Sequence, residues 1–160
     1  MEYRIRTAVP ADEKRIRELF IEMLRTIYGT DDVKGYGDGA LDRFWNGNED
    51  RAYVAEDNDV VAFLSVEVHH DMGGYIYLDD FSVTEAYRSK GIGSELIRTA
   101  ESYAKETGMP AVVLHVEKSN ESAMRFYEKI GYSVIRDDGN RNLMKKGMED
   151  SEITEAQNAT

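Results

Sequence analysis

A glycine pair beside an arginine marks the segment of this chain with the clearest chemical potential. The residues from Arg88 to Ser94 read R-S-K-G-I-G-S, and they follow the β-rich run Tyr77–Val83 and open a helical pattern. The start of a helix leaves backbone N–H groups unpaired and carries partial positive charge, and glycines let a ligand approach the main chain closely. The spacing therefore predicts an anion site for the diphosphate of a phosphorylated cofactor.

Other glycine motifs explain this segment less well. A dinucleotide fingerprint, G-x-G-x-x-G, needs a third glycine where Leu96 stands, and it would follow the strand directly rather than after the Thr84–Lys90 connection. A P-loop, G-x-x-x-x-G-K-[ST], is excluded because no lysine follows a glycine pair in that order. A plain surface turn into an amphipathic helix remains the alternative for an isolated G-x-G.

A second motif follows the apolar run Ala111–Val116. The residues from Asn120 to Tyr132 read N-E-S-A-M-R-F-Y-E-K-I-G-Y. In this order and spacing, R-x-x-G-x-G and N-x-x-A-x-x-F-Y-x-x-x-G-Y resemble the GNAT superfamily of acetyl-CoA-dependent N-acetyltransferases, and the resemblance extends from about Tyr3 to Lys146. Within that superfamily, Y-L-D-D-F-S-V followed by G-I-G-S-E-L is most similar to polyamine and diamine acetyltransferases.

The resemblance implies that acetyl-CoA is the cofactor and that two segments hold it. The backbone of the strand end would bind pantetheine and polarise the thioester oxygen. The N–H groups of the glycine segment, with the Ser94 hydroxyl, would bind the diphosphate, and Asn120 would add a contact although it also fits a helix cap. The cofactor-binding residues implied are Phe81, Ser82, Val83, Arg88, Ser89, Lys90, Gly91, Ile92, Gly93, Ser94, Asn120 and Tyr127.

Tyr127 matches the position of the family's usual general acid, which protonates the coenzyme A thiolate as it leaves. A tyrosine has a pKa of about 10 and stays protonated at neutral pH, so it can donate a proton. By its helical spacing alone, Tyr127 would be a core aromatic, and it is the motif that favours the role in catalysis.

Carboxylates in predicted strands are candidates for the base that accepts the proton of an amine. Asp79 and Asp80 lie inside a strand pattern, where carboxylates are uncommon. The resemblance to polyamine acetyltransferases gives Asp79 the base position, acting through water, and Glu67 on the preceding strand is the second candidate. Each would otherwise be a solvent-facing or salt-bridged acid. We expect Asp80, Tyr28 and Tyr36 to bind the acceptor amine. The two tyrosines belong to a glycine- and aspartate-rich stretch, which is alternatively a disordered surface segment.

The composition limits the class of protein. A chain of 160 residues with a 41% hydrophobic share fits one domain with a core. It has no cysteine, no long apolar run and no signal-peptide pattern, so we expect a cytoplasmic protein without a membrane partner. A net charge of −11 disfavours nucleic acid and suits a cationic small molecule, unless the charge serves only solubility. Three scattered histidines predict no metal site, and a homodimer is left open.

Hydrophobic periods and turn residues predict an α/β (α+β) fold. We expect a GNAT-like mixed, mostly antiparallel twisted sheet of six to seven strands with about four helices on both faces. A single domain should cover residues 1–147, with a flexible acidic and polar tail over 148–160. Expected strands cover 3–9, 51–56, 60–68, 75–83, 111–116, 132–136 and 142–146, and expected helices cover 12–29, 41–45, 92–106 and 120–131.

The predicted reaction is direct transfer of an acetyl group from acetyl-CoA to a primary amine of a small molecule, with a polyamine as the specific candidate. Two alternatives stay open. One is an enzyme that acetylates protein N-termini or lysines, and the other is a non-catalytic acyl-CoA-binding module, against which the presence of Tyr127 argues.

Overall fold

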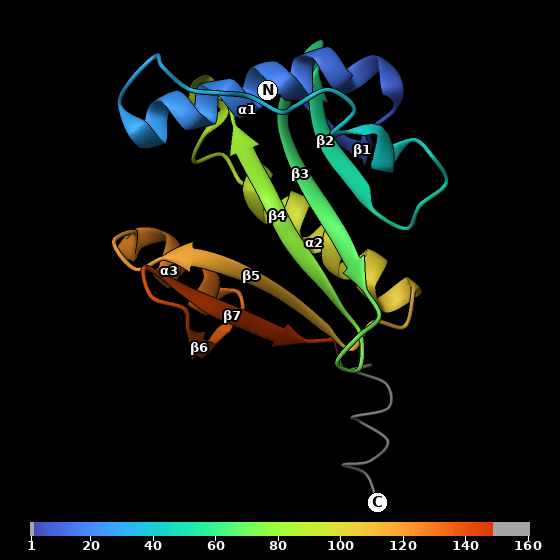
Figure 1. Cartoon of the computed structure of the whole chain (residues 1–160), viewed down its shortest axis with the longest axis vertical. Helices are drawn as coiled ribbons and strands as arrows, with labels where there is room; N and C mark the ends of the chain where they lie inside the picture. Colours follow the sequence, from blue (N-terminus) through green and yellow to red (C-terminus); the bar gives the residue numbers. More distant parts are fainter. Residues whose placement is uncertain (1, 149–160) are drawn as a thin grey trace, which may run out of the picture. The chain divides into compact units, whose positions relative to one another are not determined.

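Seven strands and three α-helices make up residues 2–148, the part of the chain that the computed structural model describes (Figure 1). The strands are β1 (Arg4–Thr7), β2 (Arg51–Asp57), β3 (Asp59–His69), β4 (Tyr75–Val83), β5 (Ala111–Glu117), β6 (Ser133–Asp137) and β7 (Arg141–Gly147). The helices are α1 (Glu13–Tyr28), α2 (Ile92–Glu106) and α3 (Glu121–Lys129), with 3-10 turns η1 (Pro10–Asp12), η2 (Asp42–Phe44) and η3 (Glu85–Tyr87). The tail expected over 148–160 lies outside the described residues except for Met148.

The strands form one sheet in the order β1-β2-β3-β4-β5-β7-β6. β4 and β5 pair in parallel, whereas β1–β2, β2–β3, β5–β7 and β6–β7 pair antiparallel, which confirms the mixed, mostly antiparallel sheet. The expected count of about four helices is slightly too high. The segment near Leu41 is only the 3-10 turn Asp42–Phe44, set between Gly39 and Gly47, whose positive φ angles of 72° and 75° do not continue a helix.

The chain divides into two compact units. The first contains the residues up to Glu67 together with Asp79–Ala100, and the second contains Val68–Leu78 together with the chain from Glu101 on. β3, β4 and α2 each contribute residues to both units.

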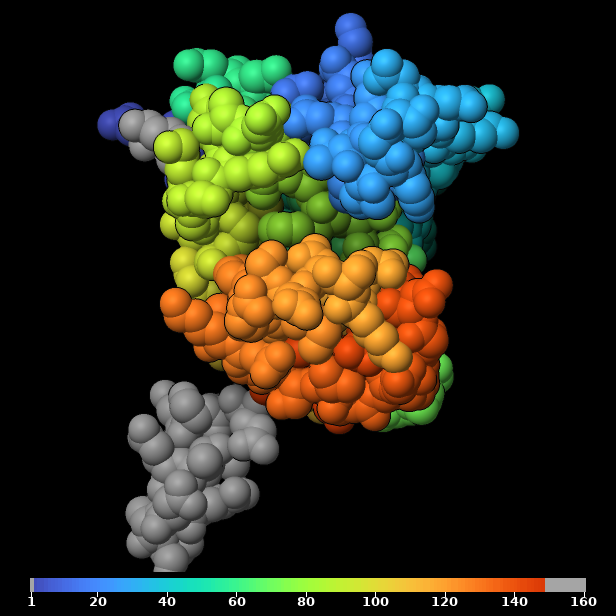
Figure 2. Space-filling view, turned by 90° about the vertical axis from the view of Figure 1, so that its left-hand side faces the viewer, coloured from blue at the N-terminus to red at the C-terminus, as the bar shows by residue number. Residues whose placement is uncertain are grey.

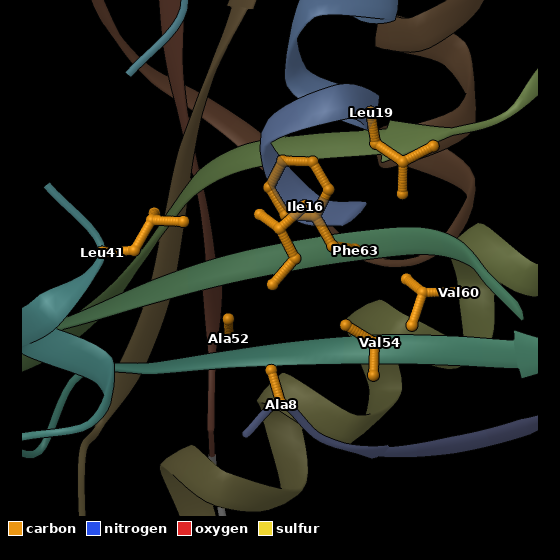
Figure 3. Packing of buried hydrophobic residues seen from close by; sticks show 8 residues of the cluster. All are labelled: Ala8, Ile16, Leu19, Leu41, Ala52, Val54, Val60 and Phe63. Carbon is orange, nitrogen blue, oxygen red and sulfur yellow. The ribbon is translucent and has the colours of Figure 1, made fainter. Parts of the chain in front are cut away.

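α1 closes the core of the first unit (Figure 3). Ile16 and Leu19 lie on its apolar face and are fully buried in a cluster with Val54 of β2 and Phe63 of β3. Burying side chains of this size stabilises a fold by about 1.5–3 kcal/mol each. Leu41, directly before η2, is buried in the same cluster, so this packing also holds the η2 segment in place.

The second unit is built around the antiparallel pairs β5–β7 and β6–β7. Leu114 of β5 pairs with Met144 of β7, and both side chains are buried. Tyr132, the last residue of the second motif, is buried as well and donates its hydroxyl to Glu101 at 2.7 Å, while Lys146 reaches the other oxygen of Glu101 at 3.2 Å. Tyr132 therefore has a structural role in the motif.

Candidate functional site

The glycine segment enters α2 through two residues with left-handed backbone. Ser89 has a φ of 62° and Gly91 a φ of 87°. The Glu95 amide donates to the Gly91 carbonyl at 3.2 Å as the first hydrogen bond of the helix, so the three amides between these residues have no helical acceptor. The start of α2 therefore presents the free N–H groups that the sequence predicts.

Thr84 and Arg88 connect the residues before this segment to α1 and to the end of β4. The Arg88 Nε donates to the Val83 carbonyl at 2.8 Å, and one of its terminal nitrogens lies 3.9 Å from Glu22 of α1. Thr84 donates its hydroxyl to the same Glu22 carboxylate at 2.9 Å, and the surfaces of α1 and this segment adjoin on the face shown in Figure 2. The end of β4 and the start of α2 are thus held together by side-chain bonds.

The two glycines have different physical roles. A Cβ atom on Gly91 would meet nothing within 4 Å, so its glycine identity serves the positive φ and an open approach. A Cβ atom on Gly93 would lie 2.8 Å from the ring of Phe81, so this glycine lets α2 pack closely on β4. The sequence predicts the ligand-facing role for both, and the structure distinguishes them.

Arg43 of η2 lies among three carboxylates in the first unit. It approaches Glu67 of β3 at 2.6 Å, Asp50 at 3.4 Å and Asp79 of β4 at 3.6 Å. Tyr36 donates its hydroxyl to Asp80, the neighbour of Asp79, at 2.5 Å. We call Tyr36, Arg43, Asp50, Glu67, Asp79 and Asp80 the acidic cluster.

The surroundings of Asp79 change its proton affinity. Burial, followed by the negative charges of Asp80 and Glu67, raises the pKa of this carboxyl to about 6, although Arg43 opposes the rise. Burial also raises the pKa of Asp80, which the hydrogen bond from Tyr36 partly counters. A carboxyl that titrates near pH 6 can accept a proton close to neutrality, which suits a general base.

Most of the predicted base and acceptor residues lie in the acidic cluster. Asp79, Asp80, Glu67 and Tyr36 are joined there, and the ring of Tyr36 stacks on Phe20 of α1 at 3.9 Å between centroids. Tyr28 is 68% exposed at the C-terminal end of α1 and takes part in none of these bonds.

Arg43 and Asp50 are the members of the acidic cluster that the sequence did not predict, and Arg43 is its cation. It stands in a short 3-10 turn without a motif, and its partners are distant in sequence. The available signal was indirect, since acids predicted to share a partly buried site require a cation nearby.

In the second unit, Asn120 and Tyr127 belong to α3. The Asn120 side chain accepts the Ala123 amide at 3.1 Å, so its helix-cap role is confirmed. The Tyr127 ring is half-buried, with Phe126 and Tyr132 edge-on to it, and burial raises the pKa of its hydroxyl. Within residues 2–148, every fully buried side-chain polar atom has a hydrogen-bond partner. The Tyr127 hydroxyl has no such partner there, so it is not fully buried and can donate a hydrogen bond at the accessible surface.

Comparison with known proteins assigns the family. The acetyltransferase (GNAT) family model matches residues 20–132, and the chain therefore belongs to the GNAT family of acetyltransferases. Mycothiol acetyltransferase of Corynebacterium efficiens is 34% identical over 90 residues, which are 56% of this chain and 30% of that protein. N-alpha-acetyltransferase 30 of Schizosaccharomyces pombe is 33% identical over 86 residues, 51% of this chain and 56% of that protein. The matches thus span less than two-thirds of either relative.

A solved structure shares the fold over nearly the whole chain. The PaiA N-acetyltransferase of Thermoplasma acidophilum, in complex with coenzyme A, superposes with a TM-score of 0.76 at 20% identity and covers 92% of this chain and 99% of its own. Within residues 2–148, no helix is long and apolar enough to cross a membrane, and no group of metal-ligating side chains is assembled.

The position of Arg43 leads to a prediction about Asp79. Replacing Arg43 with glutamine removes the cation that favours the ionised carboxyl, so the pKa of Asp79 should rise above its value of about 6. A carbon-detected NMR titration of the aspartate carboxyls measures this shift directly. Arg15→Gln, which removes a cation paired with Asp59 elsewhere in the first unit, is the matched control and should leave Asp79 unchanged. An unaltered titration of Asp79 in Arg43→Gln would contradict the electrostatic role of Arg43.

Proposed function

We propose that this protein is an acetyl-CoA-dependent N-acetyltransferase that acetylates a primary amine of a small cationic molecule. The observation that carries the proposal is the acidic cluster, in which a carboxyl with a pKa of about 6 lies among further acids. Membership of the GNAT family and the coenzyme A bound to the PaiA relative support the choice of cofactor.

The residues at the start of α2 fit the diphosphate of coenzyme A. Gly91 leaves open space beside the main chain, and the amides of Ile92, Gly93 and Ser94 precede the first hydrogen bond of the helix. These donors would hold the diphosphate, together with the backbone of residues 88–91. Acetyl-CoA supplies an acetyl group activated as a thioester.

The end of β4 would bind the pantetheine arm through its main chain. The Ser82 hydroxyl already donates to the Leu19 carbonyl at 3.3 Å and is buried, so the side chain of Ser82 is committed to the core. The contribution of Phe81, Ser82 and Val83 would therefore come from backbone groups, as the family resemblance implies.

Asp79 is the better of the two candidate bases. A primary ammonium has a pKa of about 10.4 and must lose a proton before its nitrogen can attack a carbonyl carbon. Glu67 lies 2.6 Å from Arg43, whereas Asp79 lies 3.6 Å from the same guanidinium and has the raised pKa. Asp79 would accept the proton, while Glu67 would share Arg43 with Asp50.

Tyr127 would act as the general acid. Its hydroxyl is a free donor, and burial raises its pKa, so the proton stays in place until the departing thiolate accepts it. Asn120, already the cap of α3, would contribute to cofactor binding only through the position of this helix.

The charge of the acidic cluster favours a cationic acceptor. Around Asp79, the negative charges of Asp80 and Glu67 raise the pKa more than the guanidinium of Arg43 lowers it, so negative charge is in excess there. Such an excess of negative charge attracts ammonium groups, and the attraction weakens as salt screens it. A polyamine or diamine is the specific acceptor that we propose.

An amine panel tests the acceptor class. Release of coenzyme A from acetyl-CoA should be fastest with spermidine, spermine or putrescine, and the apparent affinity for these amines should weaken as salt is raised. Peptide N-termini and neutral amino acids are the comparison, because the relative from Schizosaccharomyces pombe is named as an N-alpha-acetyltransferase. Selective acetylation of peptide N-termini would overturn the polyamine proposal, and no turnover of any amine would favour a non-catalytic acyl-CoA-binding module.

A second prediction concerns the glycine with the open approach. Gly91→Val places a branched side chain beside the free amides and strains a backbone with a φ of 87°, so coenzyme A should bind at least about tenfold more weakly, or roughly 1.4 kcal/mol. Calorimetric titration with coenzyme A measures the change. Gly108→Val is the matched control, because Gly108 has a φ of 74°, an equally open side and no place in the motif. If a folded Gly91→Val protein bound coenzyme A with wild-type affinity, the diphosphate would not bind at this segment.

A third prediction isolates the proton of Tyr127. Tyr127→Phe keeps the ring and its contacts with Phe126 and Tyr132 but deletes the donor, so turnover should fall by roughly ten- to a thousandfold. Coenzyme A affinity should stay within about twofold, since only a hydroxyl is lost. Tyr3→Phe serves as the control for loss of a tyrosine hydroxyl elsewhere. If Tyr127→Phe kept wild-type turnover, Tyr127 would have a role in packing and not in proton transfer.

A further inference from the structure

The second unit carries a trough of about 300 Å³ on one face of its strands. Small apolar side chains make the floor, with Ala111 and Val113 of β5 and Leu143 of β7. Tyr75 and Tyr77 of β4 line one wall. None of these residues belongs to the acidic cluster or to the glycine segment.

The register of the strands brings these side chains to one face. Alternate residues of a strand point the same way, so Ala111, Val113 and His115 share a face of β5. Val113 pairs with Lys145 and His115 pairs with Leu143, so the facing residues of β7 join the same surface. On β6, Arg136 pairs with Leu143 after an irregularity that follows Val134. The trough therefore follows from the pairing of four strands.

The size and lining of the trough suit a small apolar body. Ligand pockets in proteins measure about 300–1,000 Å³ and are mostly apolar with a few polar groups. A volume of about 300 Å³ lies at the lower limit and fits a molecule with roughly ten heavy atoms. At the rim, Met72 is 86% exposed and Ile135 is 53% exposed, so apolar surface is available to contact a bound molecule.

Three of the lining residues, Tyr77, His115 and Arg136, belong to a chain of hydrogen bonds that includes Asp138. The Tyr77 hydroxyl lies 2.7 Å from His115 Nδ1, and His115 Nε2 lies 2.7 Å from Asp138. Arg136 binds the same carboxylate through two nitrogens, at 2.6 and 3.0 Å. Arg136 and His115 hold the pKa of Asp138 down, to about 2, so the carboxylate stays ionised and its charge is matched by Arg136. The polar groups of these residues therefore hydrogen-bond to one another.

Lys145 is the unmatched charge of the trough. Its side chain is exposed, and no carboxylate within residues 2–148 forms an ion pair with it. A lysine stem can lie along apolar surface while its ammonium remains at the edge. On the same wall, Arg136 uses Nε and one terminal nitrogen for Asp138 and retains a further N–H donor group. The wall formed by β6 and β7 therefore offers positive charge beside an apolar floor.

We propose that this trough binds a small amphipathic carboxylate. The ring or alkyl body of the ligand packs on Val113 and Leu143, and its carboxylate pairs with Lys145 and the free donors of Arg136. A neutral molecule of the same shape lacks the ion pair, and an amine of the same shape meets positive charge. The site is independent of the proposed acetyl transfer, because all of its residues lie in the second unit and none is assigned to that reaction.

Benzoate, with benzamide and benzylamine as isosteric comparisons, is the probe for this site. We expect benzoate, added to the full chain saturated with coenzyme A, to shift amide NMR signals of residues 111–115 and 143–145, and benzamide and benzylamine to shift them much less. Lys145→Gln should weaken benzoate binding by about fivefold, the effect of losing one partly exposed ion pair. Lys129→Gln, which removes an exposed lysine of α3 outside the trough, is the matched control and should leave the affinity unchanged.

Filling the trough gives a second, independent readout. Val113→Phe should abolish the benzoate shifts, and the amide spectrum of this variant shows whether the fold is retained. Lys145→Glu, a change at an exposed position, tests the charge without altering the apolar floor of the trough. Equal shifts from benzoate and benzamide, equal affinity in Lys145→Gln and Lys129→Gln, or no shifts at millimolar benzoate would each overturn the proposal.

Discussion

The proposed chemistry depends on how one guanidinium is shared among several carboxylates. At the effective dielectric of a protein surface, two unit charges 4 Å apart interact by about 4 kcal/mol before solvation is counted, so neighbouring acids cannot ionise independently. Arg43 approaches Glu67 most closely and Asp79 least closely, and Asp80 accepts a hydrogen bond from the hydroxyl of Tyr36. Burial and the negative charges of Asp80 and Glu67 therefore outweigh Arg43 at Asp79, whose pKa of about 6 gives this carboxyl a proton affinity near neutrality.

The fold of the first unit fixes the positions of the residues in the acidic cluster. Arg43 stands two residues after Leu41, which is buried with Ile16 and Phe63, so the core that holds α1 on the sheet also fixes the backbone of η2. Glu67 and Asp79 come from the regular strands β3 and β4. Regular strands and packed aliphatic side chains thus hold charged groups at distances that those groups would not adopt on a flexible loop.

The elements that were predictable from the sequence are those specified by local signals. Both ends of α2 and both ends of β4 were placed correctly, because turn residues and a change of hydrophobic period mark them. Asn120 was identified as a helix cap from its position before an amphipathic run. Two motifs in the correct order were enough to identify the family, although the roles of individual motif residues remain proposals.

The features that were not predictable depend on contacts between distant segments. Arg43 and Glu67 are 24 residues apart, and nothing near either residue specifies the other. The same limit applies to Gly93, whose closeness to Phe81 appears only when α2 packs on β4. Tyr36, in the stretch before β2, joins the acidic cluster, whereas Tyr28, at the C-terminal end of α1, does not, and composition alone cannot separate these two tyrosines.

The most direct test of the account is the pH dependence of kcat/KM for spermidine in the wild-type protein and in Asp79→Asn. Because Asp79 takes a proton from the bound ammonium, the reactive state needs an ionised Asp79 and a protonated amine. The value of log(kcat/KM) for the wild-type protein should therefore rise with a slope of about one below pH 6 and level off above it. Asp79→Asn should show a slope of about one throughout, because only the amine still titrates. A wild-type profile without a change of slope near pH 6, or an Asp79→Asn profile that retains it, would contradict the assignment of Asp79 as the base.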